Sequence, residues 1–379
     1  MKIWKDIENA TLAEVLAWAA AQPWACAMAS CKQDAGWHAE GDVWTHTAMV
    51  IRELERLSEW PTLDRDSQFK LQFAALFHDS GKPLTTIVDP ETGRTRSPKH
   101  SIVGMEIGRT VLRNLGCDLA FREEVCSLVR YHGRPPYLLE KPDPAREVIA
   151  TSWQVSNRLL YLFALADTRG RTTTNTARAE DNLHLWKMVA EENDCFVQPY
   201  PFANDHARFL FFRGQLSSLH YVPREAFRCT VTMMSGLPGA GKDTWLSVHR
   251  PNLPVVSLDD VRSSLDVDAT DDQGEVVQVA REWCREHLRA KRDFAFNATN
   301  SMRLTRTRWI DLFADYDAEI EIVYLEPSLK VLHYQNENRE KAVPRRAIER
   351  LIAKLEPPTQ TEAHRVVYHR EDSVRSRSV

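Results

Sequence analysis

The segment from Gly236 to Thr244 constrains the fold of this chain more than any other. It reads GLPGAGKDT, follows an apolar run that predicts a buried strand, and precedes a stretch that continues as a helix. In a strand–turn–helix setting, such a glycine-rich turn wraps phosphate oxygens with its backbone N–H groups. The segment therefore predicts an α/β domain that binds a nucleotide.

The turn supplies the candidate nucleotide contacts, which are Gly236, Gly239, Ala240, Gly241, Lys242, Asp243 and Thr244. Lys242 would bring its charge to the β- and γ-phosphates of ATP or another NTP. Asp243 stands where these loops usually carry a Ser or Thr that binds Mg²⁺, and Thr244 comes one position later. We expect the metal contact either through water or through Asp243 itself.

The pattern of apolar residues changes in the middle of the 379-residue chain, a length that suggests two domains. The first half shows apolar residues at helical spacing and almost no strand signal. The second half alternates helices with four short β-branched runs, at 230–234, 254–258, 293–298 and 318–325, which predicts a parallel sheet covered by helices. The expected organisation is an all-α helical bundle over 1–198, a connector over 199–227, an α/β phosphate-loop domain over 228–369 and a disordered tail over 370–379.

Composition limits the partners and the setting. The formal net charge of −4 means that nucleic acid would bind at a local basic patch and not over a whole cationic face. Seven scattered cysteines form neither a disulfide framework nor a CxxC zinc pattern, which indicates a reducing, cytoplasmic setting. No apolar run is long enough to span a membrane, so no membrane partner is expected.

Histidines and aspartates lie on separate expected helices of the first half. His46, the adjacent pair His78-Asp79, and Asp167 are divided among three of them, as in helical bundles that direct metal ligands into their core. The His-Asp pair ends an apolar helix, where two buried polar side chains need partners. Imidazole and carboxylate together suit Mg²⁺ or a first-row divalent metal and do not choose between them. A histidine taken alone is more often an ordinary surface or hydrogen-bonded residue than a metal ligand.

This set resembles the HD superfamily of metal-dependent phosphohydrolases. The Gly81-Lys82-Pro83 continuation matches the HD-x-GK form that is common in that family. The resemblance implies an HD-type bundle with one or two divalent transition-metal ions. The first ion would be bound by His46, His78, Asp79 and Asp167.

Two further histidines fit the larger members of the superfamily, which bind two metals. By resemblance, His100 and His132 would complete a second site with Asp79. Two ions about 3.5–4 Å apart would bridge a hydroxide and hold the phosphate. Lys82 and Arg171 are the candidate phosphate contacts.

Polar residues also mark the carboxyl ends of strands in the second half, where a parallel sheet binds its ligand. Asp259 could accept the proton of an attacking hydroxyl, or could merely cap the helix that follows. Arg262, one turn later, could hold an anionic acceptor. A third strand ends in the polar residues 297–300, and Arg339 lies in a basic break that would close over the phosphates as a lid.

The order of these motifs over about residues 230–356 resembles the phage-type 5′-hydroxyl polynucleotide kinases. The resemblance implies that Lys242 contacts phosphate and that Asp259 is the general base. It also implies that Arg262 grips the 3′-phosphate of the acceptor and that Arg339 is the arginine of the lid.

Both halves together resemble the bacterial HD-Pnk end-healing enzymes. The HD domain would remove 2′,3′-cyclic, 2′- or 3′-phosphate from RNA or DNA ends, with Asp79 and Lys82 among its catalytic residues. The kinase would move the γ-phosphate of an Mg²⁺-bound NTP to a 5′-OH. The chain has no ligase lysine motif, so a separate polynucleotide ligase would seal the ends.

Two alternatives belong to other functional classes. One is an HD nucleotidase fused to a small-molecule kinase for nucleosides or nucleotides, and Arg262 argues against it because a nucleoside offers no 3′-phosphate. The other is a nucleotide-sensing regulator whose phosphate loop is a switch. A switch needs neither the base Asp259 nor the lid Arg339.

Overall fold

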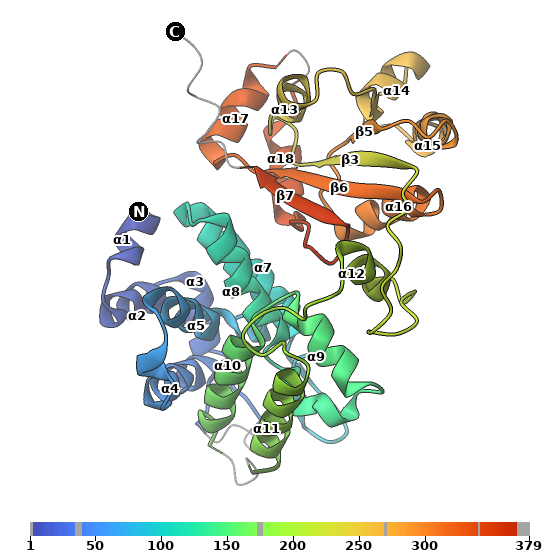
Figure 1. Cartoon of the computed structure of the whole chain (residues 1–379). Helices are drawn as coiled ribbons and strands as arrows, with labels where there is room; N and C mark the ends of the chain where they lie inside the picture. Colours follow the sequence, from blue (N-terminus) through green and yellow to red (C-terminus); the bar gives the residue numbers. More distant parts are fainter. Residues whose placement is uncertain (1–2, 35–39, 173–176, 269–270, 340–341, 370–379) are drawn as a thin grey trace. The chain divides into compact units, whose positions relative to one another are not determined.

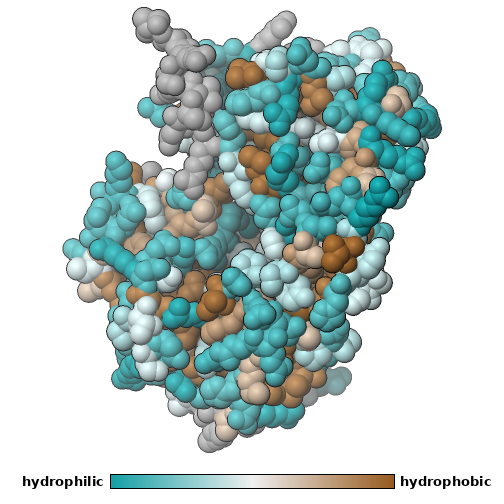
Figure 2. Space-filling model, viewed as in Figure 1, coloured by the Kyte–Doolittle hydropathy of each residue, from teal (hydrophilic) through white to brown (hydrophobic). Residues whose placement is uncertain are grey.

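The computed structural model describes residues 3–34, 40–172, 177–268, 271–339 and 342–369. The chain divides into two compact units, Met1–Pro201 and Phe202–Val379 (Figure 1). Hydrophilic residues dominate the visible face in Figure 2, with hydrophobic residues in small patches between them. No helix among the described residues has the length and apolar character needed to cross a membrane.

The N-terminal unit is built almost entirely from helices. They are α1 (Trp4–Glu8), α2 (Leu12–Ala20), α3 (Pro23–Ala29), α4 (Val43–Arg56), η1 (Trp60–Thr62), α5 (Arg65–Phe77), α6 (Lys82–Thr85), α7 (His100–Leu115), α8 (Leu119–Tyr131), η2 (Pro135–Glu140), α9 (Pro144–Ser152), α10 (Asn157–Arg169) and α11 (Ala177–Glu192). Helix α10 is central, since it is buried along almost its whole length and packs against α4, α5, α8 and α11. The predicted all-α fold of this half is confirmed.

Local sequence explains where these helices begin and end. Asp42 and Asp64 accept hydrogen bonds from the first turns of α4 and α5, as N-cap residues do. Gly116 ends α7 with a φ of 79°, the left-handed conformation that favours glycine. Helix α10 begins at Asn157, because the Ser156 side chain caps it by accepting a hydrogen bond from the N–H of Leu159. A short antiparallel hairpin, β1 (Ile87–Val88) and β2 (Thr95–Arg96), was not predicted.

The C-terminal unit contains a five-stranded parallel sheet, which confirms the predicted α/β class. Its strands are β3 (Cys229–Ser235), β4 (Val255–Ser257), β5 (Phe294–Asn297), β6 (Ala318–Leu325) and β7 (Arg365–His369), in the spatial order β4-β5-β3-β6-β7. Its helices are α12 (Asp205–Phe212), α13 (Lys242–His249), α14 (Leu258–Leu265), α15 (Gly274–Arg289), α16 (Arg303–Ala314), α17 (Leu329–Glu337) and α18 (Arg345–Ala353). Four strands were predicted, and β7 was missed.

The apolar strands and the inner faces of the helices form one core around β3, β5 and β6. The predicted irregular connector contains a helix, α12, whose Phe209 and Phe211 are buried. Prolines on both sides of this short helix hide its periodicity in the sequence. The predicted disordered tail, 370–379, lies outside the described residues.

Candidate active sites

All six predicted metal ligands of the N-terminal unit come together in one cluster, hereafter the histidine–aspartate cluster. Its members are His46 on α4, His78 and Asp79 after α5, His100 at the start of α7, His132 after α8 and Asp167 on α10. Ligand atoms of His46, His78 and Asp167 all lie within 4.8 Å of one another, and those of Asp79, His100 and His132 do the same. Two groups of three donors are therefore built side by side.

Asp79 lies between the two groups. Its Oδ2 is 3.2 Å from Nε2 of His78 and 3.9 Å from Nε2 of His46, in the first group. Its Oδ1 is 3.5 Å from Nε2 of His100, in the second group. One carboxylate thus offers one oxygen to each group. This arrangement suits a carboxylate that bridges two metal ions.

Each of the four histidines uses Nδ1 to bond with the protein and presents Nε2 to the cluster. The acceptors are the carbonyls of Ala75 for His78 (2.8 Å), Ser97 for His100 (2.8 Å), Val129 for His132 (2.7 Å) and Gly170 for His46 (3.3 Å). Donation from Nδ1 leaves the lone pair on Nε2, as in metal-ligating histidines. Nε2 of His78 is buried and makes no hydrogen bond. The donor set therefore fits a divalent metal.

Charges around the cluster keep its carboxylates ionised. Burial opposes ionisation of Asp79, but His78 and Lys82 hold its pKa well below the usual range. Burial likewise opposes ionisation of Asp167, yet Arg171 and His46 hold its pKa well below the usual range. Buried carboxylates that stay charged mark a site where positive charge is favoured.

The histidines differ in charge. Burial lowers the pKa of His132 to about 3, helped by His78 and His100, so His132 is neutral. Burial would also lower the pKa of His46, but its hydrogen bonds to Asp167 and Glu40 raise it to about 9. A neutral imidazole is the form that binds a metal, so metal binding at His46 would release the proton that Asp167 and Glu40 favour.

Two cations reach the cluster from its edge. Lys82 Nζ lies 2.7 Å from Asp79 Oδ2 and donates to Gln33 Oε1 at 2.6 Å. The Arg171 guanidinium donates to Asp167 Oδ2 at 2.6 Å. The two predicted phosphate contacts therefore stand beside the predicted metal ligands.

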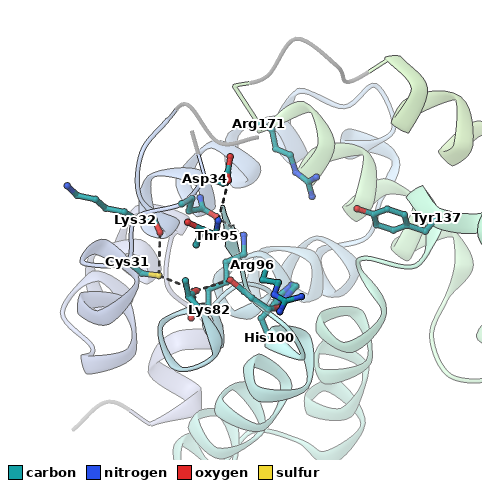
Figure 3. A pocket seen from close by; sticks show the side chains of 12 residues that line it. Cys31, Lys32, Asp34, Lys82, Thr95, Arg96, His100, Tyr137 and Arg171 are labelled. Carbon is teal, nitrogen blue, oxygen red and sulfur yellow. Dashed lines mark hydrogen bonds between the residues drawn. The ribbon is translucent and has the colours of Figure 1, made fainter. Parts of the chain in front are cut away.

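A cavity of about 250 Å³ borders the cluster, because Lys82, His100 and Arg171 belong to its lining. Figure 3 shows the guanidinium groups of Arg96 and Arg171 turned toward this space, with the hydroxyl end of Tyr137 facing them. An anion next to the metal ligands would find complementary charge here.

The phosphate loop of the C-terminal unit joins β3 to α13. Gly236 has a φ of 154°, and a Cβ at this position would lie 2.7 Å from the carbonyl oxygen of Leu325. Gly239 has a φ of 81°, and a Cβ at this position would lie 3.1 Å from Asn336 on α17, so a larger residue would be strained here. The glycines are required by close backbone contacts as well as by conformation.

Lys242 is the first residue of α13 and points back into the loop. Its Nζ donates to the carbonyls of Gly236 (3.0 Å) and Leu237 (3.1 Å). Burial lowers the pKa of Lys242 to about 8, although Asp243 and Asp259 act in the opposite direction, while Arg339 lowers it further. The charges of Asp259, the predicted base, and of Arg339, the predicted lid arginine, therefore both affect the pKa of Lys242.

Asp243 has a partner that the sequence did not indicate. Asn297, at the carboxyl end of β5, donates from Nδ2 to Asp243 Oδ1 at 2.6 Å, while its own Oδ1 is buried without a hydrogen bond. The motif expects a metal-binding hydroxyl at this place. Carboxylate and amide oxygens are ligands that Mg²⁺ accepts.

Asp259 and Arg262 lie together on α14. The Arg262 guanidinium donates to Asp259 Oδ1 at 2.5 Å and to Gln273 Oε1 at 2.7 Å. Asp259 is 75% exposed, so it is open to an acceptor. The helix is capped by Ser257, which accepts from the N–H groups of Asp259 and Asp260, so the alternative of Asp259 as the cap is wrong.

Three residues near these sites carry no motif. They are Glu40, Gln33 and Arg96. Each reaches its site through the fold alone, and Glu40 lies 3.1 Å from His46 Nδ1 through its Oε1. Asn297 belongs to the polar residues 297–300 that were predicted at the end of the third strand, but its pairing with Asp243 was not predicted.

Comparison with known proteins identifies both domains. Residues 43–153 match the family described as HD domain, and residues 231–358 match the family described as AAA domain. A solved sugar kinase from Janibacter sp. HTCC2649 aligns with a TM-score of 0.30 and 17% identity, covering 38% of this chain and 85% of that one.

Curated relatives include the CC-adding tRNA nucleotidyltransferase of Thermus thermophilus, 34% identical over 42% of this chain and 33% of that protein. The A-adding tRNA nucleotidyltransferase of Deinococcus radiodurans is 35% identical over 23% of this chain and 20% of that protein. The chain therefore spans a third or less of the length of these two relatives. Neither name refers to end healing, so that resemblance stays a prediction. Residues 43–153 are thus similar to an HD domain, and residues 231–358, which include the phosphate loop, are similar to an AAA domain.

Proposed function

We propose that this chain is a bifunctional enzyme that prepares broken RNA or DNA ends for a separate ligase. The HD domain would remove 2′,3′-cyclic, 2′- or 3′-phosphate from one end. The kinase-like domain would transfer the γ-phosphate of ATP or another NTP to the 5′-OH of the other end. Both products are the substrates that a ligase joins.

The observation that carries the first activity is the position of Asp79. It offers Oδ2 to His78 at 3.2 Å and Oδ1 to His100 at 3.5 Å. Two divalent ions held by these groups would activate a water and polarise the phosphoryl oxygens. Lys82 and Arg171, which now pair with Asp79 and Asp167, are placed to neutralise charge on the phosphate.

Residues of the chain would assist the remaining steps of this hydrolysis. Water adds to phosphorus and gives up a proton, the bond to the sugar oxygen breaks, and that oxygen takes up the proton that the water released. Lys82 would neutralise negative charge on the phosphate as the bond to the sugar oxygen breaks. Its Nζ lies 2.7 Å from Asp79 Oδ2. His132, which burial keeps neutral, has an Nε2 lone pair that can serve as a ligand.

The second activity is supported by Lys242 and the pair of Asp259 and Arg262. Lys242 would leave the loop carbonyls for the NTP phosphates, and Asp259 would accept the proton of the attacking 5′-OH. A 3′-phosphate on the acceptor would compete for the Arg262 guanidinium and so free Asp259 for this role. Asp243 and Asn297 are the candidate ligands for the Mg²⁺ that accompanies the NTP.

Two observations favour polynucleotide over small substrates. Arg262 is positioned beside the base by Gln273, where only an acceptor with a 3′-phosphate would use it. The names of the curated relatives refer to tRNA, which supports RNA ends in particular.

The test uses one RNA oligonucleotide with a 5′-OH and a 2′,3′-cyclic phosphate, incubated with the protein, ATP and a divalent metal. We expect a 5′-phosphate and loss of the cyclic phosphate. Arg262→Ala should weaken phosphorylation of this RNA and have a smaller effect on a nucleoside without a 3′-phosphate. Equal effects on both acceptors would favour the small-molecule kinase, and ATP binding without any transfer would favour the regulator.

A further inference from the structure

We infer that the cavity beside the histidine–aspartate cluster binds the terminal nucleotide of a polynucleotide 3′ end, with Tyr137 stacked on the terminal base and Arg96 on the next phosphodiester. This inference rests on the proposed phosphoesterase activity and adds the residues that select its substrate. Neither Tyr137 nor Arg96 belongs to the predicted metal or phosphate-binding set.

The size of the cavity suits one nucleotide. Its volume is about 250 Å³, below the ~300–1,000 Å³ of pockets that enclose drug-sized ligands. A space of this size takes one terminal residue at most and leaves no room for a duplex end. Its scissile phosphate would lie at His100 and Lys82, which line the cavity and contact Asp79.

Tyr137 is presented to this space by a segment that is anchored by its neighbours. It lies in η2, where the neighbouring Pro135 and Leu138 are buried and Asn182 donates to the carbonyl of Pro136 at 2.7 Å. The Tyr137 side chain nevertheless stays 53% exposed and lines the cavity, with its hydroxyl end toward Arg171 in Figure 3. An exposed aromatic ring on a fixed backbone is the usual stacking platform for an unpaired base.

Arg96 provides a positive charge in addition to those of Lys82 and Arg171, which would lie beside the scissile phosphate. Lys82 and Arg171 already contact ligand carboxylates at 2.7 Å and 2.6 Å, so they serve the phosphate at the metals. Arg96 comes from strand β2 of the hairpin and is exposed at the edge of the cavity. A guanidinium at this edge fits a phosphodiester that leaves the cavity with the rest of the strand.

Three RNA substrates separate the two contacts. The first is an oligonucleotide with a normal 3′-phosphorylated end, and the second is the same RNA with an abasic terminal residue. The third is a nucleoside 3′-monophosphate, which keeps the base and lacks the next phosphodiester. All three contain the same scissile phosphate, so KM and kcat report on the additional contacts.

Tyr137→Ala should raise KM for the normal end about 5- to 100-fold, the range found when a stacking ring is removed, with kcat little changed. Its effect should vanish on the abasic end, and Tyr137→Phe should behave as wild type. Arg96→Ala should raise KM for both oligonucleotides and leave the mononucleotide unchanged. Leu139→Ala and Arg94→Ala, exposed neighbours outside the cavity lining, are the matched controls.

Equal effects of Tyr137→Ala on normal and abasic ends would overturn the stacking role. Equal effects of Arg96→Ala on oligonucleotide and mononucleotide would overturn the phosphodiester contact. If wild type hydrolyses none of the three, the proposed function fails. Fluorescence anisotropy with a labelled 3′-phosphorylated RNA and its abasic counterpart still tests the inference in that case, because the same pattern of affinities is expected, and its absence would refute it.

Discussion

Glu40 is expected to set the metal affinity of the histidine–aspartate cluster through His46. Its Oε1 lies 3.1 Å from His46 Nδ1, and its side chain is only 2% exposed. His78, His100 and His132 instead donate from Nδ1 to backbone carbonyls alone. A carboxylate partner makes an imidazole more electron-rich and therefore a stronger ligand.

The expected loss of metal affinity in Glu40→Gln follows from the change of a charged hydrogen bond to a neutral one. A bond to a charged group contributes ~1.5–3 kcal/mol and a neutral bond ~0.5–1.5 kcal/mol, so the difference is about 1–1.5 kcal/mol. Since 1.4 kcal/mol corresponds to a factor of 10, glutamine should weaken metal binding about 5- to 10-fold. Glu40→Ala removes the carboxylate partner of His46 altogether and should approach the ~100-fold upper limit for such partners.

The assay is titration of the metal-free protein with Co²⁺ or Mn²⁺, followed by calorimetry and by competition with a chelator. Glu147→Gln is the matched control, because Glu147 pairs with Arg134 at 2.6 Å and with no ligand histidine. Metal affinity that is the same in Glu40→Gln, Glu40→Ala and wild type would refute the reasoning, provided that circular dichroism shows all three folded.

Three further outcomes follow from the C-terminal unit. Arg306→Met should destabilise it by about 3–5 kcal/mol in urea, because Glu362, now 2.7 Å from the buried Arg306, would lose its partner; a loss below 1 kcal/mol would contradict this. Burial lowers the pKa of His364 to about 3, so the unfolded chain takes up a proton below about 6.5 while the folded unit does not. Stability should therefore fall by up to ~1.4 kcal/mol per pH unit from His364 between about pH 6.5 and 3, a slope that His364→Asn should remove in urea melts at several pH values. Asp243→Ala should abolish the Mg²⁺-dependent gain in ATP affinity measured by calorimetry, and a loss in Thr244→Ala instead would reverse the assignment.

The spacing of polar residues on apolar helices predicted that His46, His78-Asp79 and Asp167 would lie together, whereas His100 and His132 were added only by the resemblance to the HD superfamily. His46, Asp79 and Asp167 lie far apart in the sequence, yet each stands at the inner face or the end of a strongly periodic helix. The packing of α4, α5 and α10 then brings them together. Partners on irregular segments could not be predicted, because Glu40 lies in no periodic pattern and reaches His46 only after the chain folds.

In the C-terminal unit, too, local motifs could be predicted from the sequence and long-range pairings could not. The phosphate loop is readable because its glycines meet strict local requirements, such as the 2.7 Å approach to Leu325 at Gly236. Strand β7 was missed because it lies at the sheet edge with only Val366 buried, so it has a weak apolar signal. The pairing of Asn297 with Asp243 spans 54 residues and depends on the parallel sheet order.

Separation of the two activities by single substitutions tests the central claim most directly. The RNA with a 5′-OH and a 2′,3′-cyclic phosphate is treated with Asp79→Ala and with Lys242→Ala, and both ends are analysed in each reaction. Asp79→Ala should lose removal of the cyclic phosphate and keep 5′-phosphorylation, whereas Lys242→Ala should do the reverse, since each residue serves a different unit. Loss of both activities in either folded variant, or an unchanged end at the expected position, would contradict the account.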